Sequence, residues 1–238
     1  RHEVEVHNAR LFEPRPTLDR EGVELVDFSD APDDEHDTEG LIRDYYPRVE
    51  ELVAQETGAT RVHAFDHNLR SSEKEATQGT SILAPVWLAH NDYTETSGPK
   101  RVRDVMAAAD ADRFLGHRFA MVNVWRSIGA SAERTPLAVA DARTMDQRDY
   151  LATDLVYQDR VGEIYQNAYS DAQKWYWYPN MGGDEVMLLK CFDTAHDGRA
   201  RFTSHTGFEN PNAPAGTPPP PGRGKLAVIK NGRTLGVM

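Results

Sequence analysis

The feature that most restricts the fold of this chain is a series of short apolar or alternating segments that begins near residue 60 and continues to the C-terminal end. Each segment has the length of a β-strand, and Gly, Pro, Asn or Asp separates it from the next. The predicted strands are 60–67, 81–90, 118–126, 136–142, 163–168, 174–178 and 185–192. A closing hairpin is predicted from 226–230 and 233–237 around Asn231-Gly232. Strands of this kind without regular helices between them predict an antiparallel sandwich or barrel with helical decoration, and they disfavour a Rossmann unit.

Helices are predicted in two places. Residues 38–57 carry apolar side chains at helical spacing, from a cap at Thr38 to a stop at Gly58, with a break near Pro47. One further short helix is predicted over residues 99–109. The chain therefore reads as mainly β, in one domain.

The charge and cysteine content exclude several classes of function. Lys and Arg number 27 against 38 Asp and Glu, which gives a net charge of −11 that repels nucleic acid and anionic membranes. No apolar stretch approaches the roughly 18 residues that a membrane span requires. The single cysteine, Cys191, excludes an intramolecular disulfide and a thiolate zinc site. We therefore expect a cytoplasmic protein that binds neither nucleic acid nor membrane.

Three residues form a candidate metal site: His90, Asp92 and His205. Residues i and i+2 of a strand point to the same face, so His90 and Asp92 can present an imidazole and a carboxylate to one point. With one distant histidine they make the two-His, one-carboxylate set that leaves open positions on Fe(II). Spacing alone leaves other interpretations open: His90 as a hydrogen-bonded core residue, and Asp92 as a turn or helix cap.

Several ordered motifs then carry a resemblance to one protein family. They are Ala89-His-Asn-Asp-Tyr-Thr94, 118–128, 136–143, 175–193 and 197–208, together with 18–25, 45–52 and 61–70 in the N-terminal part. From residue 10 to about 221 the chain resembles the fungal and bacterial hydroxylase/desaturase family of non-haem iron, 2-oxoglutarate-dependent dioxygenases. That family includes the fungal gibberellin desaturase and the aspergillic-acid cluster hydroxylase.

The resemblance implies a double-stranded β-helix, the jelly-roll or cupin-like fold, in one dioxygenase domain over residues 1–238. Residues 1–58 are then an N-terminal strand and helix extension that packs on the jelly roll. It also implies Fe(II) held by His90, Asp92 and His205 as catalytic residues, with 2-oxoglutarate and O₂ as co-substrates. The expected reaction is hydroxylation or desaturation of a small-molecule secondary metabolite.

Oxoglutarate needs a cation for its distal carboxylate, and the planar fork of arginine binds a carboxylate best. Arg223 is the counterpart of the family's arginine, although Lys225 stands where the family has serine and the family's following glutamate is absent. Arg126 is a second candidate, with an ordinary strand-end arginine as the other interpretation. Tyr93 and Arg70 are further candidates for contact with oxoglutarate or substrate. For Arg70 an ion pair with Asp66 is the favoured interpretation.

Other functions remain as alternatives. The altered tail is compatible with a metal-binding jelly-roll protein that has lost oxoglutarate-dependent activity or uses its metal for another reaction. A zinc hydrolase has the required ligand types but lacks a general-base motif such as His-Glu-x-x-His. The methyltransferase label that some relatives carry finds no support, because no glycine-rich loop follows a strand in a βαβ context. A homodimer is compatible with the sequence. Arg199 and Arg201 are interpreted as solvated residues beside a turn.

Overall fold

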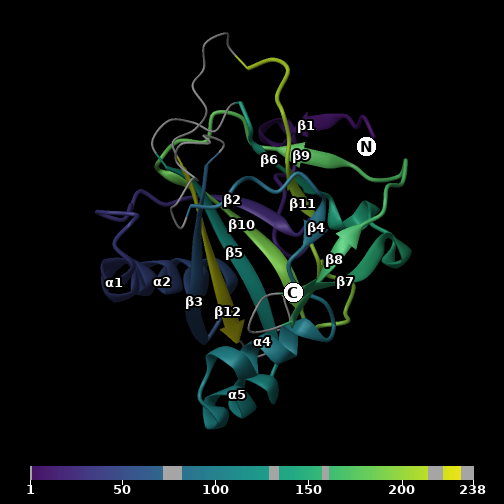
Figure 1. Cartoon of the computed structure of the whole chain (residues 1–238). Helices are drawn as coiled ribbons and strands as arrows, with labels where there is room; N and C mark the ends of the chain where they lie inside the picture. The colour runs from purple at the N-terminus through teal and green to yellow at the C-terminus, as the bar shows by residue number, and fades with distance from the viewer. Residues whose placement is uncertain (1, 72–81, 129–133, 157–160, 214–221, 232–238) are drawn as a thin grey trace.

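Two β-sheets pack face to face in the computed structural model, which describes residues 2–71, 82–128, 134–156, 161–213 and the backbone of 222–231 (Figure 1). The seven-stranded sheet has, in spatial order, β1 (Val6–Asn8), β9 (Trp175–Trp177), β6 (Leu137–Ala140), β11 (His205–Gly207), β4 (His90–Asn91), β8 (Val161–Asn167) and β7 (Tyr150–Val156). The five-stranded sheet has β2 (Val23–Asp27), β10 (Glu185–Asp193), β5 (Phe119–Ile128), β12 (Gly222–Asn231) and β3 (Arg61–Arg70). This two-sheet arrangement is a jelly roll, as the family resemblance implies.

The core between the sheets is apolar because the alternating strands turn one set of side chains inward. Trp125, Met187 and Leu189 of the five-stranded sheet cluster there with Val139 and Tyr176 of the seven-stranded sheet. All described strand pairs are antiparallel except β1 with β9.

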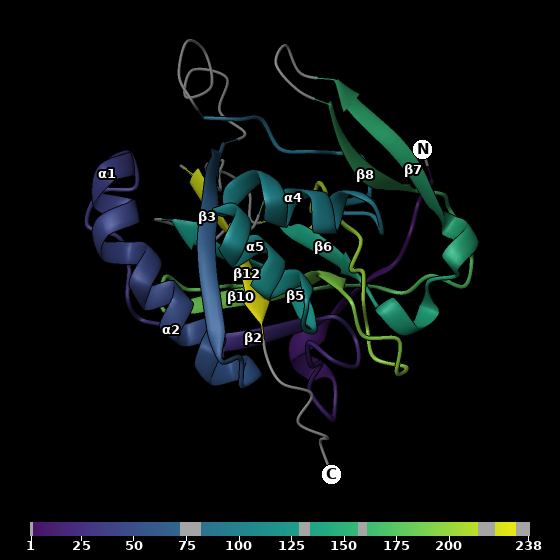
Figure 2. The same ribbon diagram turned by 90° about the horizontal axis from the view of Figure 1, so that it is seen from below.

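The predicted helix over 38–57 is confirmed, and it covers the outer face of the five-stranded sheet beside β3 (Figure 2). It consists of α1 (Thr38–Gly40), a π-helical turn η2 (Leu41–Tyr45) and α2 (Tyr46–Thr57). Asp37 supplies the N-cap in place of Thr38, and Gly58 ends α2 in the left-handed conformation at φ 63°. The break lies just before Pro47, which is tolerated in the first turn of α2.

Two helices replace the single one predicted over 99–109: α4 (Ser97–Val105) and α5 (Ala108–Leu115). Their buried side chains pack on the inward side of β5 and β10, against Met121 and Phe192. Short 3-10 turns complete the described elements: η1 (Ala9–Leu11), η3 (Ala142–Thr144) and η4 (Gln147–Asp149).

The predicted strand over 81–90 is wrong for its described residues. Apart from one bridge between Arg70 and Leu83, pairing begins only at His90. Leu83, Trp87 and Leu88 are 43%, 55% and 52% exposed, so their apolar character belongs to a surface rather than to the core. The strands β7 and β11 were not predicted. The second half of the predicted closing hairpin lies outside the described residues.

The first 58 residues do more than pack against the sheets. β1 pairs with β9 at the edge of the seven-stranded sheet, and β2 pairs with β10 at the edge of the five-stranded sheet. The N-terminal segment therefore contributes one strand to each layer. In the described part of the chain, no helix has the length and apolar character needed to cross a lipid bilayer.

Candidate active site

His90, Asp92 and His205 come together between the sheets. His90 of β4 and His205 of β11 are direct Cα partners, and their ring centroids lie 4.6 Å apart. Asp92 follows β4 and reaches back to both rings, with Oδ1 3.6 Å from His90 Nε2 and Oδ2 3.7 Å from His205 Nε2. One ligand atom from each residue lies within 4.8 Å of the others. The structure thus gathers all three predicted metal ligands at one point.

Backbone carbonyls set the orientation of both imidazoles. His90 Nδ1 lies 2.8 Å from the carbonyl oxygen of Leu88, and His205 Nδ1 lies 3.1 Å from that of Thr203. A carbonyl oxygen can only accept, so each Nδ1 carries the proton and each Nε2 keeps its lone pair. Metal-binding histidines are commonly held in this way. Two such nitrogens and a carboxylate are the donor set of non-haem Fe(II) sites, so these residues fit the metal that the resemblance implies.

The Asp92 carboxylate is held from behind by the five-stranded sheet. Asn123 Nδ2 donates to Asp92 Oδ2 at 2.5 Å, and Cys191 Sγ lies 3.6 Å from the same oxygen. Asn123 Nδ2 also lies 3.0 Å from Cys191 Sγ. Both residues are buried, so solvent does not compete for these contacts. Neither residue was predicted as part of the site. A polar Asn123 within the otherwise apolar segment 119–125 was the available signal.

Two hollows meet at His90. An inner cavity lies between the sheets, and its lining residues include Arg70, His90, Asn123, Trp125, Leu137 and His205. A wider cleft of about 570 Å³ opens on the other side of His90 and reaches Asp92 and Tyr93. A metal at this point would therefore face a narrow apolar-walled space and an open cleft at the same time.

Two ion pairs lie in the walls of the cleft. Arg101 of α4 lies 3.6 Å from Asp66 of β3, and Lys100 lies 2.7 Å from Asp104. At the rim, Leu88 and Val161 are 52% and 53% exposed. The cleft thus combines charged walls, in which Asp154 and Glu163 add carboxylates to these pairs, with an apolar rim.

Tyr93 lines this cleft directly after Asp92. Burial and the neighbouring Asp92 charge raise the pKa of the Tyr93 phenol far above its ordinary value. The hydroxyl therefore stays protonated at neutral pH. The structure brings this predicted residue to the edge of the site.

Arg126 is not brought to the site. Asn123 and Trp125 face the interior, so Arg126, one position further along β5, faces the helix-covered side of the sheet. Its guanidinium donates to the Tyr45 hydroxyl at 2.9 Å and to the carbonyl oxygens of Asp30 and Gly183. Arg126 joins the N-terminal segment to the sheet and faces away from the histidines.

Arg223 lies on β12, where only the backbone is described. Its Cα partners are Ser127 of β5 and Arg70 of β3. Directly opposed residues share a face of the sheet, and Arg70 lines the inner cavity. Arg223 and Arg70 therefore occupy neighbouring positions at one end of that cavity. Asp66, the expected ion-pair partner of Arg70, pairs with Arg101, while Arg70 Nη1 donates to the Ala84 carbonyl at 2.7 Å.

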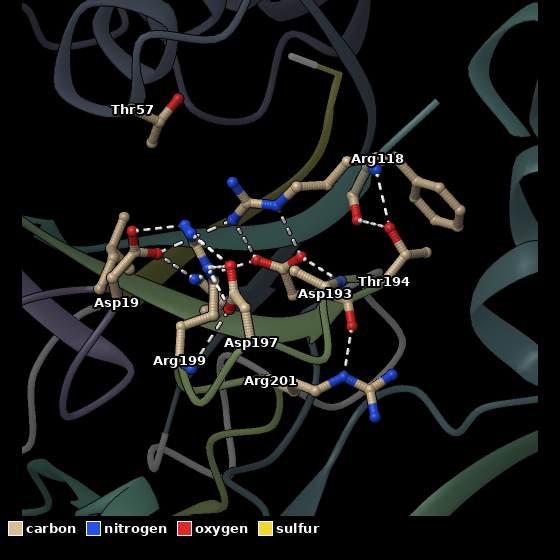
Figure 3. Close-up of polar contacts among 12 residues, drawn as sticks. Asp19, Thr57, Arg118, Asp193, Thr194, Asp197, Arg199 and Arg201 are labelled. Atoms are coloured by element: carbon tan, nitrogen blue, oxygen red, sulfur yellow. Dashed lines mark hydrogen bonds and ion pairs between the residues drawn. The ribbon is translucent and has the colours of Figure 1, made fainter. Parts of the chain in front are cut away.

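The loop that leads from β10 to His205 is held by a cluster of ion pairs (Figure 3). Arg118 makes two hydrogen bonds to the buried Asp193, at 3.0 and 2.6 Å, and Lys190 lies 3.1 Å from that carboxylate. Arg199 links Asp197 of the loop to Asp19 of the N-terminal segment. The interpretation of Arg199 as solvated is wrong, since its side chain is only 15% exposed.

Arg201 is likewise paired rather than solvated. Its guanidinium makes two hydrogen bonds to Glu95, at 2.6 and 2.9 Å, and one to the Asp193 carbonyl. Its side chain is 16% exposed. These pairs fix the course of the chain just before His205.

Comparisons with known proteins agree with this geometry. A protein family described as an oxidoreductase/YMDC permease-like domain matches residues 1–220. The hydroxylase/desaturase efuI of Hormonema carpetanum is 30% identical over 87% of this chain and 76% of its own length. The Fe(II)/2-oxoglutarate-dependent dioxygenase nvfI of Aspergillus novofumigatus is 29% identical over 92% of this chain and 79% of its own length.

A solved structure shows the same architecture. The iron and alpha-ketoglutarate-dependent endoperoxidase NvfI superposes with a TM-score of 0.89 at 26% identity, over 98% of this chain and 86% of that chain. The family match, the relatives and the shared fold lead to one conclusion: the chain belongs to the hydroxylase/desaturase family of Fe(II)/2-oxoglutarate-dependent oxygenases.

Proposed function

We propose that this protein hydroxylates or desaturates a small-molecule substrate, with Fe(II) bound by His90, Asp92 and His205. The observation that carries the proposal is the cluster of two Nε2 atoms and one carboxylate between an inner cavity and an open cleft. Bound iron would couple conversion of 2-oxoglutarate and O₂ into succinate and CO₂ to insertion of one oxygen atom into a C–H bond, or to removal of two hydrogens with release of water.

The protein's own residues perform three tasks in this proposal. The carbonyls of Leu88 and Thr203 keep both Nε2 lone pairs directed at the metal position. Trp125 and Leu137 give the inner cavity apolar walls that exclude water from the reacting groups. The cleft on the other side of His90 receives the substrate.

We assign the distal carboxylate of 2-oxoglutarate to the end of the inner cavity where Arg70 and Arg223 hold opposed positions. Arg70 lines that cavity, and the register of β12 sets Arg223 beside it. Arg126 has no part in this assignment, because its guanidinium lies on the helix-covered face. Tyr93 contributes a neutral phenol to the substrate side of the metal.

The test is binding of 2-oxoglutarate by calorimetry to the Mn(II)-loaded protein, followed by succinate release with Fe(II), ascorbate and O₂ across a panel of small molecules. Binding and substrate-stimulated succinate release are the expected results. Metal binding without oxoglutarate binding would instead support a jelly-roll protein that uses its metal for another reaction.

Two expectations about the cellular context complete the proposal. The acidic chain with one cysteine favours action in the cytoplasm, which fractionation of cells that express the protein tests. A homodimer remains a prediction, and light scattering on the purified protein measures it.

A further inference from the structure

Asn91 lies between two of the proposed metal ligands in the chain, and its side chain is fully buried. Its Nδ2 donates to the carbonyl oxygen of Tyr93 at 2.7 Å and to that of Cys191 at 2.8 Å. Its Oδ1 accepts the backbone N–H of Thr203 at 3.0 Å. One carboxamide therefore makes three hydrogen bonds to three separate backbone positions.

Each of these backbone positions is next to a proposed metal ligand in the chain or belongs to a residue that contacts one. The Tyr93 carbonyl lies directly after Asp92. Cys191 belongs to β10, and its Sγ faces the Asp92 carboxylate. Thr203 holds the His205 ring, because its carbonyl oxygen accepts from His205 Nδ1. Asn91 thus joins the segment that carries His90 and Asp92 to the segment that carries His205.

A second buried carboxamide acts on the carboxylate itself. Asn123, 2% exposed on β5, donates from Nδ2 to Asp92 Oδ2 and contacts Cys191 Sγ with the same group. These contacts leave Asp92 Oδ1 directed toward His90 and hold Oδ2 on the side of His205. The rotation of the Asp92 carboxylate is therefore set by the five-stranded sheet.

We propose that Asn91 and Asn123 are positioning residues that assemble the metal site before the metal binds. Asn91 sets the separation between His205 and the His90–Asp92 pair, and Asn123 sets the orientation of the Asp92 carboxylate. The inference rests on the proposed function for the identity of the ligands. It adds the residues through which two strands far apart in sequence hold those ligands at a fixed spacing.

The energetic reason is that the Asn91 carboxamide is fully buried, so water does not replace the hydrogen bonds that it makes. Replacing Asn91 by alanine removes its three hydrogen bonds and leaves the backbone groups that it contacted without this partner. These groups can then form new hydrogen bonds only if the chain moves. Such movement changes the distance between ligand atoms. Loss of an outer-shell partner commonly weakens metal binding about 10- to 100-fold.

The experiment uses Co(II) as the probe, because its visible absorption reports coordination geometry. The metal-free protein and the variants Asn91→Ala and Asn123→Ala are titrated with Co(II), and the spectrum at saturation is recorded. Thermal unfolding of the metal-free proteins shows how much of each sample is folded. We expect the Kd for Co(II) to rise about 10- to 100-fold in both variants, with a changed spectrum at saturation.

Gln173→Ala is the matched control. The Gln173 carboxamide also makes three hydrogen bonds, donating to Asp149 Oδ2 at 3.0 Å and the Ala168 carbonyl at 2.7 Å and accepting from Asn167 at 3.2 Å. It lies outside the two hollows at the metal site. We expect its Kd and spectrum to match the wild type even if its melting temperature falls.

The outcomes separate this inference from the proposed function. If the wild type binds no Co(II), the ligand set itself is wrong. If the wild type binds Co(II) and the folded variants keep its Kd and spectrum, only the positioning role is overturned. The positioning role is also overturned if Gln173→Ala raises the Kd as much as Asn91→Ala and Asn123→Ala do. If Asn91→Ala does not fold, Asn91→Asp replaces it, since that residue keeps an acceptor for the Thr203 N–H and lacks both donors. A wild-type Kd and spectrum for Asn91→Asp would overturn the role of Asn91.

Discussion

His90 and His205 are directly paired residues of neighbouring antiparallel strands, and each donates its Nδ1–H to the carbonyl oxygen two residues before it. The same local geometry on β4 and β11 turns both Nε2 atoms toward Asp92. The orientation of both imidazoles is thus set by the backbone of their own strands.

Replacement of either histidine tests the ligand set. His90→Ala and His205→Ala each remove one of the three proposed metal ligands, so we expect metal binding and succinate release to fall to background while the far-ultraviolet circular dichroism is retained. Calorimetric titration with Mn(II) measures the first quantity. His196→Ala, an exposed histidine, is the control and should bind as the wild type does. Retained activity in both single variants would show that the ligands are misassigned.

Gly22→Ala tests the packing that supports His205. Gly22 has φ +85°, and a Cβ there would collide with Thr203 Oγ1, which donates to the Gly22 carbonyl at 3.0 Å. We expect a loss of about 1–3 kcal/mol in the free energy of unfolding, from strain and overpacking. Chemical denaturation measures it. Gly183→Ala, where a Cβ meets nothing within 4 Å, should change stability by less than about 0.5 kcal/mol. Equal stability of Gly22→Ala and wild type would contradict the close approach.

The pKa of Asp193 determines how the free energy of unfolding is expected to depend on pH. Burial opposes its ionisation, yet the hydrogen bonds from Arg118 and the charge of Lys190 hold the pKa of Asp193 below its ordinary value of 3.8. A depressed folded-state pKa means that the stabilisation is fully present above pH 3.8 and is lost as the pH falls through the lower folded-state value.

Asp193→Asn removes this stabilisation and leaves the buried Lys190 with Asp19 as its remaining carboxylate neighbour. We expect a loss of about 1.5–3 kcal/mol at pH 7, the usual contribution of hydrogen bonds to a charged group. The difference from wild type should shrink below pH 3.8, which unfolding curves at several pH values would show. A difference that stays constant down to pH 2 would refute the assignment.

Variants of three arginines distinguish a structural role from a role in binding 2-oxoglutarate. Arg126→Met removes hydrogen bonds to Tyr45 and to two backbone carbonyls, so we expect lower stability and an unchanged Kd for 2-oxoglutarate on the Mn(II)-loaded protein. Arg70→Ala and Arg223→Ala should raise that Kd about 10- to 100-fold, the equivalent of a charged hydrogen bond of about 1.5–3 kcal/mol. If instead Arg126→Met raised this Kd while Arg70→Ala and Arg223→Ala left it unchanged, Arg126 would be the residue that binds the distal carboxylate.

Much of the architecture was predictable because its signals are local. The period of the segment at 118–126 identifies a strand, and the helix over 38–57 follows from its apolar spacing and its Gly58 stop. The segment 81–90 misled the prediction for a physical reason. Its Leu83 and Leu88 are apolar because they form the rim of a cleft, and hydropathy does not distinguish a binding surface from a core.

By itself, the sequence determined the strand-rich fold through local period and spacing. Its ordered motifs, through their resemblance to known relatives, determined the family and predicted His90, Asp92 and His205 as ligands. Only the tertiary structure decided that His205 pairs with His90, that Arg126 faces the helices, and that Asn91 and Asn123 hold the ligands. Alternation along β5 separates Asn123 from Arg126, but which face is inward depends on what the sheet packs against. Pairing register and packing between distant segments are non-local, so they emerge only when the whole chain is folded.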